Sequence, residues 1–247
     1  MLYQLLSGAM AVLAQQQIQL IGGHSLAGND LAFGLSCNGF AQPEQLWPKG
    51  GLQPGQALIL TKALGTGTLF AAAAQGKAKG RWIDGAIAAM VQSNAPAVAI
   101  LRQHQTTACT DITGFGLLGH LGEMVKASAT SIALELAALP LLPGAAETLG
   151  QGIVSSMDPA NGQAQRWVSN WPEKTNELEI NEPATNEPQA PVPRRILFDP
   201  QTSGGLLAAL PREQAEACVA ALQAQGYGYS RIIGHSLAEG SPQIQLI

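Results

Sequence analysis

The apolar residues of this chain follow two spacings, one typical of helices and one typical of strands. The clearest helical pattern covers residues 211–225, with a proline at its start and Gly226 just past its end. Proline suits the first turn of a helix and glycine suits its C-terminal cap, so both ends are marked. The apolar positions recur at intervals of three and four residues and predict a buried stripe: Ala215, Cys218, Val219 and Leu222.

The remaining chain mixes further segments of both kinds. Helical patterns cover residues 2–15, 67–74, 83–93, 115–126 and 145–149. Strand patterns cover residues 17–21, 31–40, 56–61, 131–136, 203–210, 229–234 and 243–247, and residues 108–110 lead into a loop. The regular strand–helix–strand spacing of a parallel, doubly wound sheet is absent. We therefore predict an α+β fold in which helices cover a mixed or antiparallel sheet.

The N-terminal pattern argues against a targeting or membrane segment. The first 16 residues lack a basic start, and Gln and Ser interrupt their apolar positions, as in an amphipathic helix rather than a signal peptide. The longest apolar runs fall well short of the roughly 20 residues that span a bilayer. The sequence predicts a soluble cytoplasmic protein with no membrane partner.

Composition and charge single out one internal segment. The 247 residues are 46% hydrophobic and 12% charged, with a net charge of −4. Residues 172–193 hold five glutamates, one lysine and five prolines, so this segment alone carries the whole net charge. Its small number of large apolar residues predicts a disordered or extended insertion. The chain has no basic block, which argues against a nucleic-acid partner.

The cysteines do not form a recognisable cluster. Cys37, Cys109 and Cys218 are far apart, and none belongs to a C-x-x-C pair. This spacing suggests neither a zinc site nor a disulfide framework. We expect three small buried hydrophobic residues in a reducing compartment.

Two glycine-rich stretches in the first third of the chain are candidates for ligand contact. In residues 21–25, a double glycine permits close backbone approach, and His24 and Ser25 offer hydrogen bonds. The alternative is a tight turn with a surface histidine. Residues 60–67 run through Lys62 and a G-T-G sequence into a predicted helix, as in an anion-binding helix start. The alternative there is an ordinary strand-to-helix connection.

Two further stretches complete the set. Asp111, one of only five aspartates, precedes the predicted helix 115–126. Its carboxylate can cap that helix or hold Mg²⁺, and Thr113 is an equally good cap. We expect His120, beside several leucines, to be packed and hydrogen-bonded. Residues 198–207, with Asp-Pro and Ser-Gly-Gly sequences, form either a structural corner or a ligand-facing loop. No nucleophile signature of the G-x-S-x-G or H-E-x-x-H type is present.

Four of these motifs occur in an order that resembles selenophosphate synthetase (selenide, water dikinase), a family similar to aminoimidazole ribonucleotide synthetase. They are LIGGHSLAG, PGQALILTKALGTG, CTDITGFGLLGHLGEM and LFDPQTSGGLL. The resemblance spans nearly the whole chain apart from residues 172–193. It implies two α+β domains, a homodimer, and a reaction of ATP, Mg²⁺ and selenide that yields selenophosphate, AMP and orthophosphate.

The resemblance also implies roles for particular residues. Gly23, His24 and Ser25 match a segment that reaches nucleotide bound across the dimer interface, and Asp111 matches a magnesium ligand. Lys62, Thr113 and Asp199 lie in matching motifs without a role to transfer. Residues 1–42 then correspond to the end of the N-terminal ATP-binding domain, and residues 43–247 to the complete C-terminal domain.

The family's catalytic cysteine or selenocysteine, with its lysine, lies in a segment before the point that matches Met1. No catalytic residue is therefore predicted here, and we expect a truncated or split chain without turnover of its own. The alternatives are a catalytically inactive binding or dimerisation module of the same fold, and a purine-biosynthesis or thiamine-phosphate kinase relative. The wording of the last two motifs argues against such a relative.

Overall fold

The computed structural model describes residues 1–171, 192–239 and 241–247. They form two units, Met1–Gln45 and Leu46–Ile247, which are described separately. The predicted insertion at 172–193 falls almost entirely outside the described residues. No helix among the described residues is long and apolar enough to cross a membrane.

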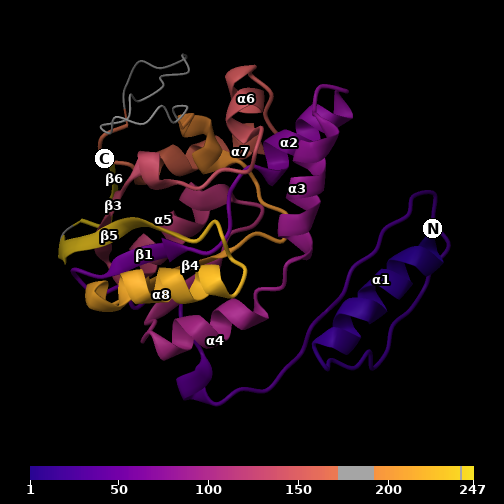
Figure 1. The fold of residues 1–247 in the computed structure, drawn as a ribbon, viewed down its shortest axis with the longest axis horizontal. Helices are drawn as coiled ribbons and strands as arrows, with labels where there is room; N and C mark the ends of the chain where they lie inside the picture. The colour runs from indigo at the N-terminus through magenta and orange to yellow at the C-terminus, as the bar shows by residue number, and fades with distance from the viewer. Residues whose placement is uncertain (172–191, 240) are drawn as a thin grey trace. The chain divides into compact units, whose positions relative to one another are not determined.

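The larger unit is built on a six-stranded sheet (Figure 1). Its strands are β1 (Ala57–Leu60), β2 (Ala108–Asp111), β3 (Thr130–Leu134), β4 (Leu206–Leu210), β5 (Arg231–Glu239) and β6 (Ile244–Leu246). They lie in the order β2-β4-β1-β5-β3-β6. All neighbours are antiparallel except β3 and β6, which are parallel. The predicted α+β class with a mixed sheet is confirmed.

Helices cover this sheet, and the smaller unit holds one α-helix and one short 3₁₀ helix. The α-helices are α1 (Leu2–Gln15), α2 (Thr66–Ala74), α3 (Gly80–Val91), α4 (Ala95–Gln103), α5 (Gly116–Ser128), α6 (Ala145–Gly150), α7 (Asp158–Asn161) and α8 (Arg212–Ala224). Short 3₁₀ turns occupy η1 (Pro43–Gln45), η2 (Leu136–Ala138), η3 (Gly162–Trp167) and η4 (Arg194–Phe198).

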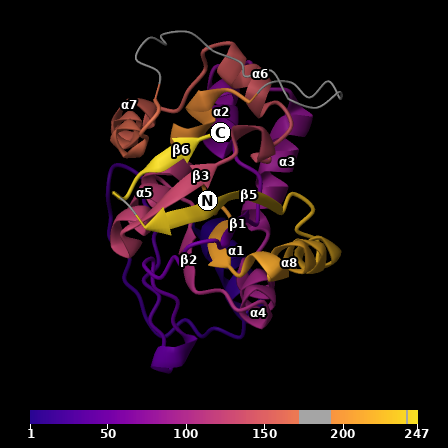
Figure 2. The ribbon, with the colours of Figure 1, turned by 90° about the vertical axis from the view of Figure 1, so that its left-hand side faces the viewer.

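The central strand β1 contributes to two separate hydrophobic cores. Leu58 and Leu60 join the core that contains the leucines of α5, whereas Ile59 joins the core made with α4 and α8. Successive side chains of a strand point to opposite faces, so a strand covered on both sides is apolar throughout. Figure 2 shows α5 on one side of the sheet and α4 and α8 on the other. On α8 the predicted stripe is confirmed, with Ala215, Cys218 and Leu222 buried.

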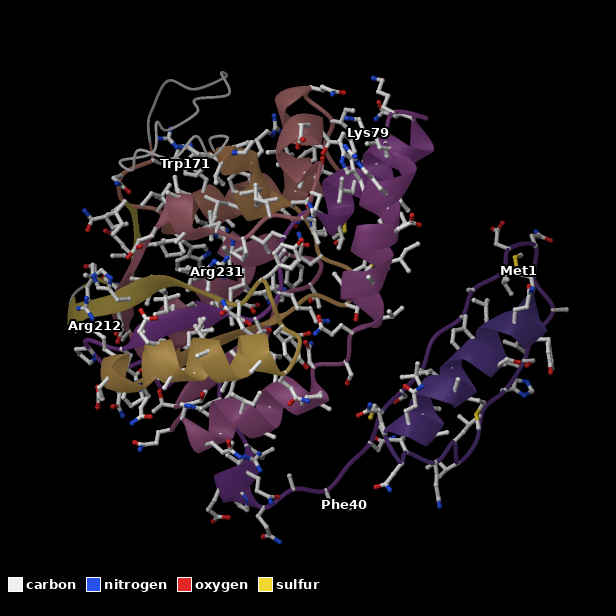
Figure 3. The ribbon with its side chains drawn as sticks, viewed as in Figure 1. Met1, Phe40, Lys79, Trp171, Arg212 and Arg231 are labelled. Carbon is white, nitrogen blue, oxygen red and sulfur yellow. The ribbon has the colours of Figure 1, made fainter. Side chains whose placement is uncertain are left out.

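The smaller unit corrects the prediction most clearly. Helix α1 is confirmed, but the strands predicted at 17–21 and 31–40 are absent from Met1–Gln45, all of which the structure describes. No residue of this unit is buried, and the side chains of Met1 and Phe40, labelled in Figure 3, are exposed. A strand needs a neighbour to satisfy its backbone donors and acceptors, and this unit supplies none.

Helix α4, the short helix α7 and strand β2 of the larger unit were not predicted. Helix α4 carries a proline in its first turn, directly after a Ser-Asn pair that is typical of a loop. Residues 108–110, expected to lead into a loop, belong to β2 instead. β2 has only four residues, and among the described strands it pairs with β4 alone, so its signal in the sequence is weak.

Candidate functional site

Three of the four glycine-rich stretches meet at one edge of the sheet. β1 ends at Leu60 and β2 ends at Asp111, whereas β4, which lies between them, begins at Leu206. In the antiparallel register Asp111 lies opposite Leu206. The chain that leaves β1 and β2 therefore lies beside the chain that enters β4. This edge is the candidate site.

Asp111 has a fixed main chain and an exposed side chain. The Ile112 N–H donates to the Gly205 carbonyl at 2.9 Å, and the Gln201 N–H donates to the Thr113 carbonyl at 2.9 Å. The two residues after Asp111 are thus both tied to the loop before β4. An exposed carboxylate on a firmly held backbone is a good oxygen ligand for a cation.

The capping alternatives for Asp111 and Thr113 are wrong. Helix α5 begins at Gly116, its N-cap position is Phe115, and no side chain caps it. The helix starts several residues after Asp111 because the chain must first turn through Gly116, whose φ is +69°. A Cβ atom there would lie 2.8 Å from the Phe198 main chain, so only glycine fits. Asp111 remains free of a role in starting the helix.

The Ser-Gly-Gly sequence before β4 is a structural corner. A Cβ atom on Gly204 would lie 2.0 Å from the Ile112 carbonyl oxygen, and one on Gly205 would lie 2.6 Å from the Lys62 main-chain nitrogen. Both glycines therefore serve close contact between backbones of this chain. Of the two interpretations left open from the sequence, the structure supports the corner.

Side chains of this chain occupy the main-chain N–H donors at the start of α2. Gln201 Oε1 accepts hydrogen bonds from the N–H groups of Gly65 at 3.0 Å and Thr66 at 3.2 Å, and Asp199 Oδ2 accepts from Gly67 at 3.1 Å. These are the donors that a bound anion would require. Of the two interpretations left open from the sequence, the occupied donors support the ordinary strand-to-helix connection over an anion cradle.

Two buried ionisable groups support this corner. Burial raises the pKa of Asp199 to about 7, although hydrogen bonds from Gln201 and Gly67 oppose the shift. Burial also lowers the pKa of Lys62 to about 8. The Lys62 ammonium donates to the carbonyls of Gln92 at 2.6 Å and Ser203 at 3.0 Å, so it joins the end of α3 to the corner.

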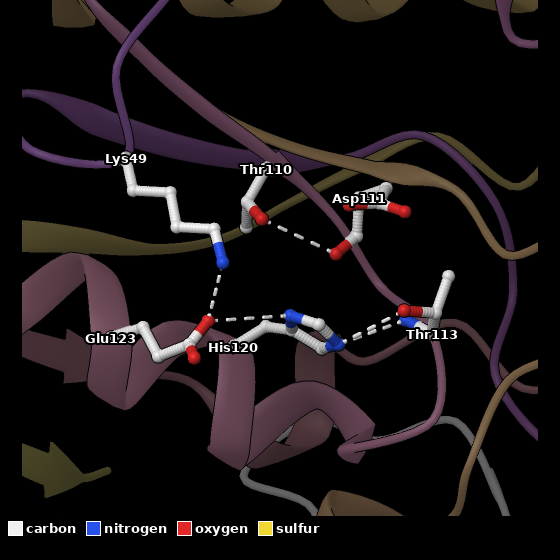
Figure 4. Close-up of polar contacts among 6 residues, drawn as sticks. All are labelled: Lys49, Thr110, Asp111, Thr113, His120 and Glu123. Atoms are coloured by element: carbon white, nitrogen blue, oxygen red, sulfur yellow. Dashed lines mark hydrogen bonds and ion pairs between the residues drawn. The ribbon is translucent and has the colours of Figure 1, made fainter. Parts of the chain in front are cut away.

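His120 is packed and hydrogen-bonded, as expected. It is buried on α5, its Nε2 lies 3.1 Å from the Thr113 main-chain nitrogen, and its ring packs against Phe115 at 5.5 Å between centroids. Its Nδ1 faces Glu123 Oε2 at 3.7 Å, and Glu123 in turn accepts from Lys49 at 2.6 Å (Figure 4). Burial lowers the pKa of His120, and the carboxylates of Glu123 and Asp111 oppose this shift.

The ion pair formed by Lys49 and Glu123 was not predicted from the sequence. His120 and Glu123 are three residues apart on one helix, and this spacing places them on the same face. The sequence therefore offered a signal for the contact between His120 and Glu123. Lys49 lies 74 residues away from Glu123 in the sequence, and nothing local to Lys49 points to it.

The stretch with the double glycine lies in the other unit. Gly23, His24 and Ser25 are exposed. With side chains of α1 they line a hollow of about 860 Å³ within Met1–Gln45. Their proposed contact with nucleotide stays a prediction, as does the assignment of residues 1–42 to an N-terminal domain.

The cysteines only partly match the expectation. Cys218 is buried, Cys109 is half-buried and Cys37 is exposed, so the prediction of three buried cysteines is wrong for Cys37. Cys37 is exposed because its unit has no core. Burial raises the pKa of Cys109 to about 12 and that of Cys218 to about 11, so these two thiols stay protonated at neutral pH.

Comparisons with known proteins identify the family to which the chain is similar. Residues 53–247 match the family described as AIR synthase related protein, C-terminal domain. The selenide, water dikinase of Pelobacter propionicus is 34% identical over 241 residues, 96% of this chain and 64% of that protein. The selenide, water dikinase of Clostridioides difficile is 32% identical over 246 residues, 100% of this chain and 67% of that protein. The chain thus spans about two thirds of the length of these relatives.

Solved structures share the fold at lower identity. The hydrogenase maturation protein HypE in complex with ATP superposes with a TM-score of 0.54 at 15% identity, over 83% of this chain and 51% of that one. The HypE–HypF complex gives 0.54 at 13% identity, over 81% of this chain and 52% of the matched chain. Likeness at this level concerns the fold alone.

Proposed function

The chain belongs to the selenide, water dikinase family, and from this premise we propose that the whole protein converts ATP, selenide and water into selenophosphate, AMP and orthophosphate. The observation that carries the proposal is the likeness to curated relatives of that name, at 32–34% identity over 96–100% of this chain. The chain corresponds to about two thirds of those proteins, so the proposed activity is that of the whole assembly.

Asp111 is the proposed magnesium ligand of this chain. Its exposed carboxylate is a hard oxygen donor, which suits Mg²⁺. Among the described residues no group of three or more His, Cys, Asp or Glu side chains could hold a metal by itself. Asp111 would therefore share the ion with phosphate oxygens, water and other residues. When bound, Mg²⁺ would neutralise phosphate charge during phosphoryl transfer.

The nucleotide contact is assigned to Gly23, His24 and Ser25. Their exposure leaves the glycine N–H, the imidazole and the hydroxyl available to ATP. We assign no catalytic residue to this chain, because none of Cys37, Cys109 and Cys218 matches the position of the family's catalytic cysteine or selenocysteine. We further place the protein in the cytoplasm as a homodimer. The exposed apolar side chains of Met1–Gln45 support a partner that covers them.

The test joins this chain to the portion of the Clostridioides difficile relative that it does not match. AMP release is measured with ATP, Mg²⁺ and selenide, and reactions without selenide serve as the control. We expect selenide-dependent AMP release from the joined protein and at least a hundredfold loss in its Asp111→Asn variant, in keeping with the loss of a charge-stabilising group. A folded joined protein that binds ATP without forming AMP would favour the inactive module.

A further inference from the structure

The hydrogen bonds of His120 define which of its nitrogens carries the proton. Nε2 lies 3.1 Å from the Thr113 main-chain nitrogen, which is only a donor, so Nε2 accepts. In the neutral ring the proton is then on Nδ1. His120 is 4% exposed, and its Nδ1 is buried without a hydrogen-bond partner among the described residues. The group it faces is Glu123, whose Oε2 lies 3.7 Å away.

Glu123 is itself held in place from outside the helix. The Lys49 ammonium donates to the same oxygen, Oε2, at 2.6 Å. Lys49 follows Pro48, whose carbonyl accepts from the Cys109 N–H of β2 at 3.1 Å. The row Lys49, Glu123 and His120 therefore joins the segment beside β2 to the second turn of α5 (Figure 4).

The residue at the end of this row, Thr113, fixes the turn that follows Asp111. Its N–H donates to His120, and its carbonyl accepts from the N–H groups of Gly116 at 3.1 Å and Gln201 at 2.9 Å. Among the described residues, His120 supplies the only side-chain hydrogen bond to the Thr113 main chain. Without an acceptor at Nε2, the Thr113 N–H would lose its partner in a half-buried turn.

We propose that His120 is a positioning residue: its Nε2 fixes the turn at Thr113 and thereby sets the place of the Asp111 carboxylate. This inference rests on the proposed role of Asp111 as a ligand for a divalent cation. A cation ligand binds best when its own backbone is held by neighbours that do not touch the metal, and loss of such a neighbour typically weakens metal binding 10- to 100-fold. Glu123, held in place by Lys49, faces the Nδ1 side of the ring at 3.7 Å and favours the ring with its proton on Nδ1 by charge.

The experiment uses Mn²⁺ as a paramagnetic probe of the joined protein described above, with ATP present to supply the phosphate oxygens and with selenide omitted. The broadening of the Asp111, Ile112 and Thr113 amide signals is followed by NMR during a Mn²⁺ titration, and amide hydrogen exchange is measured at Thr113 without metal. His120→Gln and His120→Asn form a matched pair. Both are polar, but only the longer Gln side chain places an oxygen near the position of Nε2, where it can accept from Thr113.

We expect Mn²⁺ to broaden the three signals in the unaltered joined protein and in His120→Gln. In His120→Asn we expect about tenfold weaker binding and clearly faster exchange at Thr113. Asp111→Asn should abolish the effect of Mn²⁺. A purely structural histidine would lower the melting temperature of the Asn variant without changing its Mn²⁺ affinity, and that result would overturn the inference. Equal weakening in both His120 variants would overturn it as well.

The two proposals fail in different ways. If Mn²⁺ causes no broadening that depends on Asp111, the metal role is wrong and the inference falls with it. If the broadening depends on Asp111 but not on His120, only the inference is wrong.

If the His120 variants do not fold, Glu123→Gln and Lys49→Met are used instead, since both side chains are exposed. Charge alone would make the first bind Mn²⁺ more weakly and the second more tightly. Positioning requires weaker binding in both, and opposite effects would overturn the inference.

Discussion

The starts of α2 and α5 look alike in the sequence but differ in the structure. Each follows a strand and a glycine-rich loop, and each loop carries polar residues. At α2, Gln201 and Asp199 occupy the main-chain donors of the first turn. At α5 no side chain caps the helix, and Asp111 stays exposed at the end of β2.

This difference shows that a glycine loop before a helix does not by itself indicate a ligand site. At α2 the carboxylate that satisfies the helix comes from Asp199, more than 130 residues later in the chain. At α5 the carboxylate is local and takes no part in the helix. The deciding observation is which group satisfies the donors, and only the tertiary structure gives it.

The largest effect is expected where the two regions share the same corner. Gly204→Ala would place a Cβ atom 2.0 Å from the Ile112 carbonyl oxygen and should lower the free energy of unfolding by about 3 kcal/mol. Gly228→Ala is the control, since a Cβ atom there meets nothing within 4 Å. Urea denaturation of both variants measures the difference. Equal stability of the two variants would show that the backbone around Gly204 can shift at little cost to accept a Cβ atom.

One substitution can remove the acceptor that satisfies the main-chain donors at the start of α2. Gln201→Ala leaves the N–H groups of Gly65 and Thr66 without their acceptor and should cost about 2 kcal/mol of unfolding free energy. Gln163→Ala, at an exposed position, serves as the control and should change stability by less than about 0.5 kcal/mol. If the two variants unfold at the same urea concentration, the donors of α2 do not depend on Gln201.

The same helix start should make stability depend on pH. The pKa of Asp199 is raised from 3.8 to about 7, so the folded protein holds this proton more tightly than the unfolded chain does. The resulting stabilisation is fully present below pH 3.8 and is lost as the pH rises through 7. Between pH 6 and 8 we expect the wild type to lose about 1–2 kcal/mol relative to Asp199→Asn. Parallel pH profiles in thermal melts would contradict this.

The smallest effect is expected at the open site. Asp111→Asn should change the free energy of unfolding by less than about 0.5 kcal/mol, because the side chain is exposed and caps nothing. Asp158→Asn is the contrast, since Asp158 is buried and accepts from Arg195 at 2.6 Å. It should cost about 2 kcal/mol. A loss of more than 1 kcal/mol at Asp111 would give that residue a structural role.

Sequence patterns predicted the parts of the fold in which burial repeats regularly. Helix α8 and strand β1 were found because their apolar residues follow the period of the element. The strands expected at 17–21 and 31–40 show the converse, since apolar alternation without a neighbouring strand leaves coil. Asp111 stood out because aspartate is scarce in this chain, but the resemblance supplied its role. The partners Gln201 and Lys49 are set by tertiary contacts over 74 residues or more, which no local pattern encodes.

The position of β1 has a consequence for how the protein is made. Its two neighbours, β4 and β5, lie about 150 and 170 residues further along the chain. At translation rates of about 5–20 residues per second, the ribosome needs roughly 10–30 seconds to supply them. During that interval the apolar segment Ala57–Leu60 has neither partner strand. We expect the nascent chain to recruit a chaperone such as a ribosome-bound holdase, and the sheet to close only after β5 has been synthesised.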